Sequence, residues 1–326
     1  MKKSVLIIVT ILVIIFALTA TACATKVDGV VKIGAPDGAP LLSIAELYSG
    51  KSVKYADDGI SYDVVMTDQI STIVAKLTNG EYDMAILPTN VAANAYNKGC
   101  DIKLVTVNTW GNLYMVGKGD AITDVNALCG KVVYLTAQSG VPTIMFKYIL
   151  TENGVEWVES SEAVAGKVAL AYADAQVIIP SIKQNKTEYA VLGEPAVTKA
   201  CLNAGASVLM DLQQEYKDII DGSQYGYTQA SLVARADFLE KNRAFVEEFI
   251  KGMKDNASFI SEQSNLDAFS AKVEEVTPAT SLKGITTATA AKCSTKIVTA
   301  EEAREEVNEF LAIFGISVSA DFYYAK

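Results

Sequence analysis

The chain has 326 residues, 50% hydrophobic and 20% charged, so it is long enough for two ordinary domains, and this composition excludes a disordered protein. It carries 28 basic and 38 acidic residues, a formal net charge of −10, and no basic runs, which excludes a nucleic-acid-binding footprint. It contains no histidine, which excludes Ser/His/Asp and Cys/His nucleophilic centres and histidine-ligated metal sites. We expect neither a metal nor another cofactor.

The N-terminus has the pattern of an export signal. Lys2 and Lys3 precede an apolar run from Val5 to Leu18, and the small residues of TATAC then lead to Cys23. The run is about 14 residues long, shorter than the roughly 20 that a membrane-spanning helix needs. The pattern resembles the signal of a bacterial lipoprotein, cut before a cysteine that carries diacylglycerol, with an uncleaved membrane anchor as the alternative. Both interpretations place the body of the protein outside the cytoplasm.

The first predicted βα unit follows the signal. In KIGAPDGAPLLSIAEL and the residues just before it, an apolar strand from Val30 to Ala35 leads to a turn at Asp37 and Gly38. Pro40 then opens an apolar-periodic helix, because proline suits the first turn of a helix.

The next predicted unit repeats this plan. An alternating strand passes through Thr67 and Asp68 into a helix that stops near Gly80. The segment NGEYDMAILPTN then brings Thr89 and Asn90 to the end of a further strand.

Two extended segments are predicted to cross between sheets. Residues 102–120, IKLVTVNTWGNLYMVGKGD, are β-rich with Gly111 in their middle, and they are long enough to leave one sheet and enter another. Residues 225–242, YGYTQASLVARADFLEKN, are similar and run back into helices. Two crossings predict a discontinuous first lobe and a hinge about which the lobes close on a ligand.

The landmarks of the first units recur between these crossings. The segment KVVYLTAQSGVPTIMFKYIL has a strand from Lys131 to Leu135, a turn at Ser139 and Gly140, and Pro142 opening a helix. Further on, Asp174 occupies the place that Asp68 has in the first copy, and NKTEYAVLGEP echoes NGEYDMAILPTN. The shared order predicts two homologous lobes of βαβ units, with chance similarity of two αβ segments as the alternative.

The repeated turns are the predicted ligand site, because ligands of such sheets bind beyond the carboxyl ends of the strands. Backbone N–H groups at helix starts lack intrahelical partners and can donate to a ligand oxygen. These groups belong to Gly38, Ala39, Gly140 and Val141. Side-chain donors and acceptors at equivalent strand ends are Asp37, Ser139, Thr67, Asp68, Thr89 and Asn90. Helix capping is the alternative role for each of them singly.

The cysteines beyond Cys23 are widely spaced and form no CxxC pair, which argues against a zinc ribbon. We expect four buried thiols, with one or two disulfides as the alternative in an oxidising compartment. The four residues are Cys100, Cys129, Cys201 and Cys293.

Four segments together resemble a known family: GEYDMAILPTNVAANAYNKG, DVNALCGKVVYLTAQSGVP, AVLGEPAV and LVARADFLEKNRAFVEEFIKGMKDNASFI. They are similar in order and spacing to substrate-binding proteins of ABC importers in the nitrate, sulfonate, taurine and thiamine-precursor group, over essentially the whole chain. The resemblance implies an α/β, two-lobed periplasmic-binding-protein-like fold of type II. Such a fold has two mixed, mostly parallel sheets joined by a hinge of two crossing strands.

The resemblance also implies a domain organisation. Residues 1–22 are the expected signal peptide and 23–29 a lipidated tether, while 30–108 with 230–326 form lobe 1 and 109–229 form lobe 2. The implied protein is a monomer, lipid-anchored on the extracytoplasmic face of the cell membrane, and is not an enzyme. It passes a small solute to an ABC permease driven by a cytoplasmic ATPase.

Carried over by position, the family's ligand contacts come from the loops after the first strands and from the start of the second lobe. They are Asp37, Gly38, Ala39, Pro40, Thr67, Asp68, Gln69, Thr89, Asn90, Trp110, Gly111, Gln138, Ser139, Gly140, Val141 and Pro142, with Glu194 and Gln229 as further candidates.

The solute class stays open between a sulfonate-like anion and a thiamine-precursor-like heterocycle. Helix starts at Gly38 and Gly140 favour an anion. Against an anion, no arginine lies near the turns, and Trp110 with tyrosines near the hinge offers faces on which a flat ring can stack. Two rival functions remain: an enzyme of the same fold, disfavoured by export and the lack of histidine, and a ligand-sensing lipoprotein with the same residues.

Overall fold

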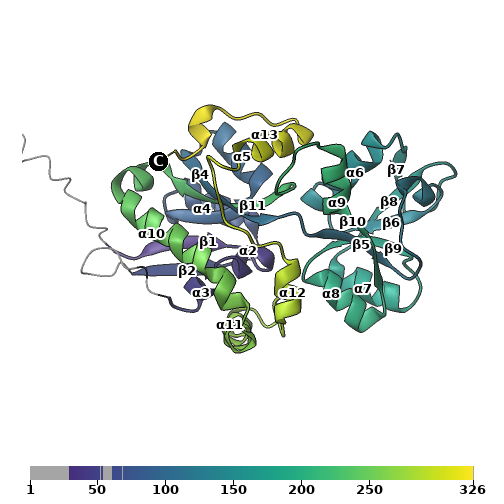
Figure 1. Ribbon diagram of the computed structural model, residues 1–326, viewed down its shortest axis with the longest axis horizontal. Coiled ribbons are helices and arrows are strands. Elements are labelled where there is room, and N and C mark those ends of the chain that lie inside the picture. The colour runs from purple at the N-terminus through teal and green to yellow at the C-terminus, as the bar shows by residue number, and fades with distance from the viewer. Residues whose placement is uncertain (1–28, 52, 54–60, 68, 326) are drawn as a thin grey trace, which may run out of the picture.

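The computed structural model describes residues 29–51, 53, 61–67 and 69–325, and these form two lobes, each built on one six-stranded sheet (Figure 1). Cys23 and Asp68, which carry two of the sequence predictions, lie outside the described residues. We call the two sheets A and B. The predicted α/β fold with two mixed sheets is confirmed.

Sheet A forms lobe 1 and is mixed. Its strands, in spatial order, are β12 (Val298–Thr299), β4 (Ile102–Trp110), β11 (Thr228–Arg235), β3 (Met84–Pro88), β1 (Val31–Ala35) and β2 (Tyr62–Met66). Strand β1 pairs in parallel with β2 and β3, whereas β11 pairs antiparallel with β3 and β4. The parallel strands β1, β2 and β3 belong to the βα units predicted from the sequence. The antiparallel part contains the crossing strands β4 and β11.

Sheet B forms lobe 2 with a matching plan. Its strands, in spatial order, are β10 (Ser207–Asp211), β5 (Leu113–Gly117), β9 (Tyr189–Gly193), β6 (Val132–Leu135), β8 (Val168–Tyr172) and β7 (Trp157–Glu159). Strands β7, β8, β6 and β9 pair in parallel, and β5 pairs antiparallel with β9 and β10. The order β3-β1-β2 in sheet A corresponds to β9-β6-β8 in sheet B. The echoed segments therefore occupy equivalent strands.

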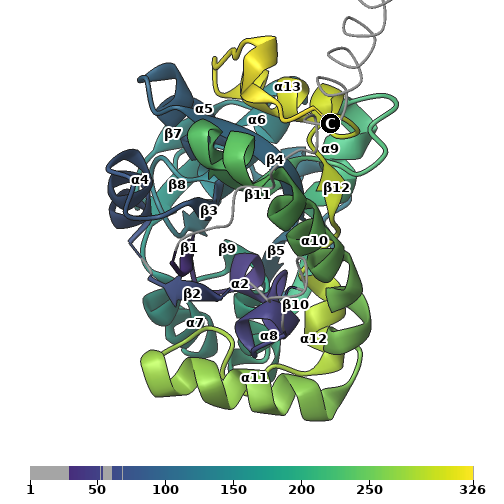
Figure 2. The same ribbon diagram turned by 90° about the vertical axis from the view of Figure 1, so that its left-hand side faces the viewer.

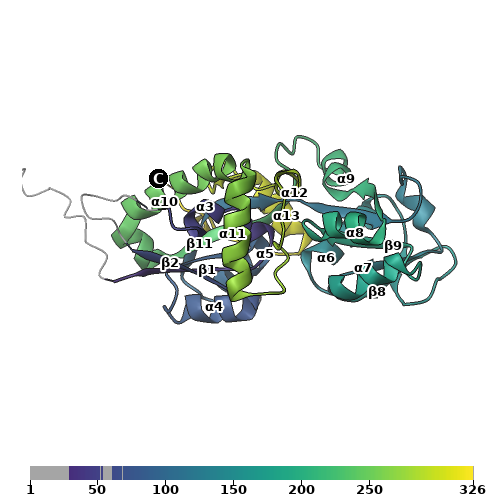
Figure 3. The ribbon, with the colours of Figure 1, turned by 90° about the horizontal axis from the view of Figure 1, so that it is seen from below.

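The predicted crossings are present. Strand β4 belongs to sheet A and β5 to sheet B, with only Gly111 and Asn112 between them. The chain returns from β10 in sheet B to β11 in sheet A. Lobe 1 is therefore discontinuous in sequence, and the lobes lie end to end with α12 (Thr287–Lys292) near their junction (Figure 3).

Helices cover both faces of each sheet. In lobe 1 they are α2 (Ala39–Leu42), α3 (Ala45–Tyr48), α4 (Ile70–Thr78), α5 (Thr89–Asn97), α10 (Ala236–Ile260), α11 (Gln263–Val276), α12 and α13 (Arg304–Ile313), with a 3-10 turn η2 (Ala320–Phe322). In lobe 2 they are α6 (Val141–Glu152), α7 (Ala175–Lys183), α8 (Ala196–Ala204) and α9 (Leu212–Ile219), with a 3-10 turn η1 (Val125–Leu128).

The helix expected after Pro40 is split. Ser43 caps α2, and its hydroxyl donates to the carbonyl of Pro40 at 2.6 Å, which satisfies a carbonyl that a longer helix would have used. Helix α3 then begins after Ile44. The apolar residues of both short helices are buried. The apolar periodicity therefore predicted the buried positions correctly, but it wrongly predicted a single continuous helix.

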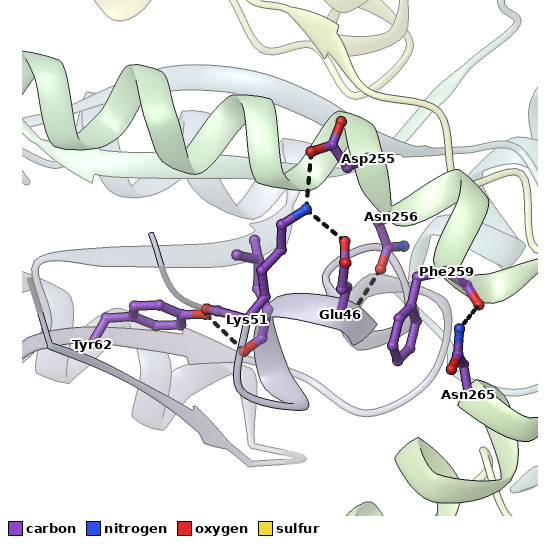
Figure 4. A network of polar contacts seen from close by, with 8 residues as sticks. Glu46, Lys51, Tyr62, Asp255, Asn256, Phe259 and Asn265 are labelled. Atoms are coloured by element: carbon purple, nitrogen blue, oxygen red, sulfur yellow. Dashed lines mark hydrogen bonds and ion pairs between the residues drawn. The ribbon is translucent and has the colours of Figure 1, made fainter. Parts of the chain in front are cut away.

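The outer wall of lobe 1 is tied together by a polar network (Figure 4). The ammonium of Lys51 lies 2.9 Å from carboxylate oxygens of both Glu46 and Asp255, and the Tyr62 hydroxyl donates to the Lys51 carbonyl. The Glu46 amide donates to Oδ1 of Asn256 at 2.9 Å. These contacts link β2, α3 and α10, and α10 with α11 covers this side of sheet A (Figure 2).

One apolar cluster runs through the junction of the lobes. It includes Trp110 of β4 and Tyr227 just before β11, together with Tyr216 of α9, and all three side chains are buried. The rings of Tyr216 and Tyr227 meet edge to face, with centroids 5.4 Å apart. The crossing strands therefore lie in a packed core.

The four described cysteines are free. Cys100 and Cys293 are buried as expected, whereas Cys129 and Cys201 are only partly buried. The sequence carried no signal for this difference, because burial of a thiol depends on packing between elements.

Candidate functional site

The predicted site loops lie at the carboxyl ends of equivalent strands. In sheet A, Asp37 follows β1 and Thr89 follows β3, while in sheet B the loop at Ser139 follows β6 and Glu194 follows β9. These ends and the crossing at Gly111 are where the two lobes meet. Each candidate side chain nevertheless has its own environment, and several are already engaged by neighbours.

Asp37 is bonded to a turn far along the chain. Its Oδ1 accepts from the Thr280 hydroxyl at 2.6 Å, and its Oδ2 accepts from the Ser281 amide at 2.7 Å. Gly38 caps α2 with a φ of 89°, a left-handed conformation that favours glycine, and Ala39 and Pro40 form the first turn. The Asp37 carboxylate therefore holds the loop 37–40 against the segment between α11 and α12.

Lys199 of α8 reaches this turn from lobe 2. Its ammonium donates to the Thr280 carbonyl at 3.4 Å, a contact between the lobes. Burial lowers the pKa of Lys199, while the nearby carboxylates of Asp37 and Glu274 act to raise it. The sequence offered no signal for Lys199, because its partner comes from a turn about eighty residues later.

Thr89 and Asn90 begin α5 but differ in environment. The Thr89 side chain is fully buried, and its hydroxyl lies 2.8 Å from that of Ser231 on β11. Asn90 is half-buried, and its Oδ1 is buried with no hydrogen-bond partner among the described residues. Of the two, Asn90 is the one with an unused acceptor.

Gln229 lies at the same end of sheet A as Thr89 and Asn90. Ala230 pairs with Pro88, the last residue of β3, so the register places Gln229 beyond the end of β3, opposite Thr89, the first residue of α5. Its Oε1 is also buried with no partner among the described residues. The structure thus brings two predicted residues from distant segments to one edge of sheet A.

Trp110 and Gly111 form the centre of the crossing. The Trp110 indole N–H donates to the Lys296 carbonyl at 2.9 Å, and the ring packs on Tyr225 with centroids 4.9 Å apart. The Gly111 amide donates to the Tyr227 carbonyl at 2.9 Å. Both residues hold the crossing strands together.

Thr67 and Gln69 flank the start of α4. The Thr67 hydroxyl accepts from the Gln69 amide at 3.4 Å, and Gln69 is exposed. The Gln69 side chain accepts from the Thr72 hydroxyl at 3.2 Å. These contacts are local to the start of the helix.

The loop before α6 is largely exposed at Gln138 and Ser139. Gln138 donates to the Glu159 carboxylate at 2.6 Å, so its amide is engaged within lobe 2. Helix α6 is capped by Gly140, with Val141 buried and Pro142 in the first turn, as the sequence predicted. The N-cap residue Gly140 has no side chain with which to bond the first turn of this helix.

Glu194 caps the helix that follows it. Its side chain is only 5% exposed, and its carboxylate oxygens accept from the Thr198 amide at 3.0 Å and the Thr198 hydroxyl at 2.9 Å. Its backbone amide donates to the Asn112 carbonyl at 3.1 Å, which joins α8 to the crossing. Burial, with the Glu194 carboxylate, raises the pKa of the Cys293 thiol to about 12, so this thiol stays protonated near neutral pH.

The sequence matches the profile of a known protein family. A family profile described as "NMT1/THI5 like" matches residues 42–265, more than half of the chain. The chain belongs to the NMT1/THI5-like family. No curated protein matches it by sequence.

Solved structures share the fold of this family member at low sequence identity. An ABC transporter protein from Parabacteroides distasonis superposes with a TM-score of 0.72 at 23% identity, covering 92% of this chain and 100% of that one. The periplasmic aliphatic sulphonate binding protein SsuA from Escherichia coli gives 0.64 at 17%, covering 90% and 91%. A Xanthomonas citri protein bound to ATP gives 0.54 at 11%, covering 88% and 98%.

Asn112 was not among the site residues predicted from the sequence of this NMT1/THI5-like chain. Its side chain is fully buried between β4 and β5, and its Nδ2 is 3.5 Å from the Glu194 carbonyl. Its Oδ1 has no partner among the described residues. The signal in the sequence that could have identified Asn112 is its position directly after Gly111 in the predicted crossing.

Several cavities of lobe 1 lie away from the predicted residues. One of about 560 Å³ is bordered by Tyr48, Lys51, Tyr62 and Lys272 on the outer wall. Another of about 580 Å³ lies between α10 and α12. Neither is lined by a predicted site residue, so these cavities do not extend the candidate site.

Within the part of the chain that the structure describes, no group of three His, Cys, Asp or Glu side chains is placed to hold a metal ion. Over the same residues, no helix is long and apolar enough to span a membrane.

Proposed function

We propose that this protein is the solute-binding component of an ABC importer, which holds a small organic solute between its two lobes and delivers it to a permease driven by a cytoplasmic ATPase. The observation that carries the proposal is the arrangement of two equivalent sheets whose carboxyl ends meet at a two-strand crossing. Membership of the NMT1/THI5-like family supports it, as does the shared fold with proteins named as ABC transporter and sulphonate-binding components.

The proposed ligand contacts are the loops between the lobes. Asp37 to Pro40, Thr67 to Gln69, Trp110 and Gly111, and Gln138 to Pro142 remain the expected borders of the site, with Glu194 supporting it as a helix cap. Asn90 and Gln229 stand out among them, because each has a buried side-chain oxygen without a partner in the described chain. Thr89 is proposed to support Asn90 through its bond to Ser231.

The proposed lobes are residues 30–108 with 230–326, and residues 109–229. Closure about the crossing strands would bring the loops of both lobes around the solute. Small-angle scattering tests this, because closure predicts a smaller radius of gyration with ligand than without it. An unchanged radius would argue against hinge closure.

The proposed location is the extracytoplasmic face of the cell membrane, with a monomer attached through a lipid on Cys23. The small-residue stretch before Cys23 and the short apolar run support it. In this arrangement residues 23–29 are the tether, and residues 1–22 are removed.

An enzymatic function is less consistent with the same observations. The sequence has no histidine, and the buried Cys293 thiol has a raised pKa, which opposes thiolate chemistry. Export of the protein also separates it from cytosolic metabolites. The proposal is therefore binding and delivery without chemical change.

Native mass spectrometry of the full-length chain, extracted gently in mild detergent, tests the proposal. A binding protein of this kind is expected to retain a stoichiometric small molecule, released intact when the protein is denatured. A chemically altered product released on incubation with a candidate solute would instead favour an enzyme.

A further inference from the structure

Lobe 1 contacts lobe 2 through a turn that is separate from the two crossing strands. Residues 277–284, which we call the bridge turn, lie between α11 and α12 of lobe 1. The Thr280 carbonyl of this turn accepts from the ammonium of Lys199, on α8 of lobe 2, at 3.4 Å. Helices α11 and α8 lie on the same side of the molecule (Figure 3). The contact therefore links the lobes at a second place, away from the crossing.

The bridge turn is fixed within lobe 1. The Leu282 amide donates to the Thr280 hydroxyl at 3.0 Å, which closes the turn on itself. The Gly284 amide donates to the hydroxyl of Ser270, a buried residue of α11, at 3.0 Å. The ammonium of Lys283 lies 2.6 Å from the Glu274 carboxylate, also on α11. The position of the Thr280 carbonyl is therefore set by α11 and not by lobe 2.

The bridge turn also holds the first predicted solute loop. The Asp37 carboxylate accepts from the Thr280 hydroxyl at 2.6 Å and from the Ser281 amide at 2.7 Å. A Cβ atom added to Gly38 would lie 3.4 Å from the Ser281 hydroxyl oxygen, so the loop and the turn are in direct contact. Lys199 thus binds, from lobe 2, the turn that positions the loop 37–40.

Lys199 lies beyond the point at which α8 joins the crossing. The Glu194 amide donates to the Asn112 carbonyl at 3.1 Å, so the start of α8 stays with the crossing. Lys199 follows Glu194 by five residues, which is more than one helical turn. A rotation of lobe 2 about the crossing can therefore keep the first bond while it separates Lys199 from Thr280.

The Lys199 ammonium has no ion pair in the described part of the chain. The side chain is half-buried, and burial lowers the pKa of Lys199, while the carboxylates of Asp37 and Glu274 act to raise it and Lys283 acts to lower it. Both of those carboxylates already accept hydrogen bonds within lobe 1. A half-buried ammonium without an ion pair adds little to stability, which favours a role in positioning the lobes.

We propose that Lys199 is a positioning residue that latches the two lobes together by binding the bridge turn, and that its loss frees lobe 2 to rotate about the crossing. The latch biases the equilibrium between lobe arrangements, because its hydrogen bond exists only in the arrangement that brings α8 to the bridge turn. The inference goes beyond the proposed function, since it concerns the arrangement of the lobes in the protein without added solute.

Double electron–electron resonance on the full-length chain in mild detergent tests the latch. Spin labels are placed on Ala268→Cys of α11 and Gln176→Cys of α7, two exposed positions in different lobes on the side of the latch. Cys129→Ser and Cys201→Ser remove the two partly buried thiols from this parent protein, and the buried thiols are not labelled in the folded state. The distribution of distances between the labels reports the arrangement of the lobes.

Lys199→Met removes the donor and keeps the length of the side chain. It is expected to raise the ratio of the rotated to the latched population about tenfold, because the variant loses a hydrogen bond made by a charged group. Lys199→Gln, whose amide nitrogen is one bond closer to the backbone, is the second variant and is expected to behave in the same way. Lys199→Arg keeps a long cationic donor and is expected to retain the parent distribution.

Lys118→Met is the matched control. The Lys118 ammonium donates to the Lys183 carbonyl at 3.2 Å and to Oδ1 of Asn185 at 2.7 Å, and all three residues belong to lobe 2. The substitution therefore removes a lysine contact to a backbone carbonyl without touching the link between the lobes. Thermal melting confirms that each variant is folded, and native mass spectrometry checks that the compared samples match in bound small molecules.

The outcomes decide the inference separately from the proposed function. A changed distance distribution in Lys199→Met and Lys199→Gln, with the parent distribution in Lys199→Arg and Lys118→Met, supports the latch. Unchanged distributions in both neutral Lys199 variants overturn it, and so does an equal change in Lys118→Met. Either of these results leaves solute binding standing. The proposed function fails on a different result, the absence of any retained solute in native mass spectrometry.

Discussion

A Cβ atom added to Gly111 would lie 1.9 Å from Oε1 of Gln213 and 2.4 Å from the ring of Tyr227. Gln213 belongs to α9 of lobe 2, and its Nε2 donates to the Tyr225 carbonyl at 2.8 Å. Helix α9 is therefore packed directly on the first crossing and bonded to the residues that precede the second. This packing makes the junction a defined structural unit in which one glycine has no room for a side chain.

Gly111→Ala is expected to destabilise the protein by about 1–3 kcal/mol, because the added methyl group overpacks the junction. Urea denaturation measures this difference. Gly119→Ala is the control, since Gly119 is exposed and a Cβ there meets nothing within 4 Å. Equal urea denaturation midpoints for both variants would show that the junction accommodates the added methyl group without loss of stability.

Asp37→Ala is expected to cost about 1–3 kcal/mol of stability, because it leaves the Ser281 amide without its acceptor. Thr280→Val keeps the carboxylate but removes a hydroxyl that donates to Asp37 and accepts from the Leu282 amide, so its cost is expected to be similar. Chemical denaturation of both variants measures the costs. If Asp37 also contacts the solute, only Asp37→Ala reduces ligand affinity, and equal affinities in the two variants would assign it to structure alone.

Thr89→Val is expected to destabilise the protein by about 1–2 kcal/mol, because it leaves the buried Ser231 hydroxyl without its hydrogen-bond partner. Solute affinity is expected to be unchanged. The double variant Thr89→Val with Ser231→Ala removes both hydroxyls and is expected to recover part of this loss. A double-mutant cycle by thermal denaturation gives the coupling. A large loss of solute affinity in Thr89→Val would instead return Thr89 to the contact set.

Thiol labelling is expected to follow burial. At pH 8 in the folded protein, the partly exposed Cys129 reacts first, and the buried Cys100 and Cys293 react only after denaturation. The pKa of Cys293 rises from 9.0 to about 12 on folding, so its contribution to stability is complete below pH 9 and is lost as pH rises towards 12. Peptide mass spectrometry after labelling identifies the order, and rapid labelling of Cys293 would contradict it.

Cys23→Ala is expected to release the protein from the membrane without changing the melting temperature of its body. The reason is that Cys23 is the proposed attachment point of the lipid and precedes the residues that the structure describes. Fractionation of cells, with Cys129→Ala as the matched control, measures the distribution. Retention of Cys23→Ala in the membrane fraction would favour the uncleaved anchor.

Local patterns were sufficient to predict much of the fold. The strands ending at Ala35, Pro88 and Leu135 and the helix beginning at Val141 lie where the sequence placed them, because apolar periodicity and the punctuation by Gly and Pro act over a few residues. The repeated order of landmarks predicted the equivalent strand orders of the two sheets.

The environment of each site residue could not be predicted in the same way. The Glu194 carboxylate accepts from the helix that follows it, and the Thr89 hydroxyl is hydrogen-bonded to that of Ser231. The Asp37 carboxylate accepts from a turn more than two hundred residues later in the chain. Each outcome depends on which donor the folded chain brings within reach.

By itself the sequence determined the two-lobed α/β architecture and the two crossings, and it predicted the loops at which we propose that a solute binds. The tertiary structure alone decided which polar atoms in those loops are already satisfied and which are left as acceptors. The physical reason is range: backbone conformation responds to neighbours in sequence, whereas the pairing of a buried polar atom depends on side chains that only folding brings together.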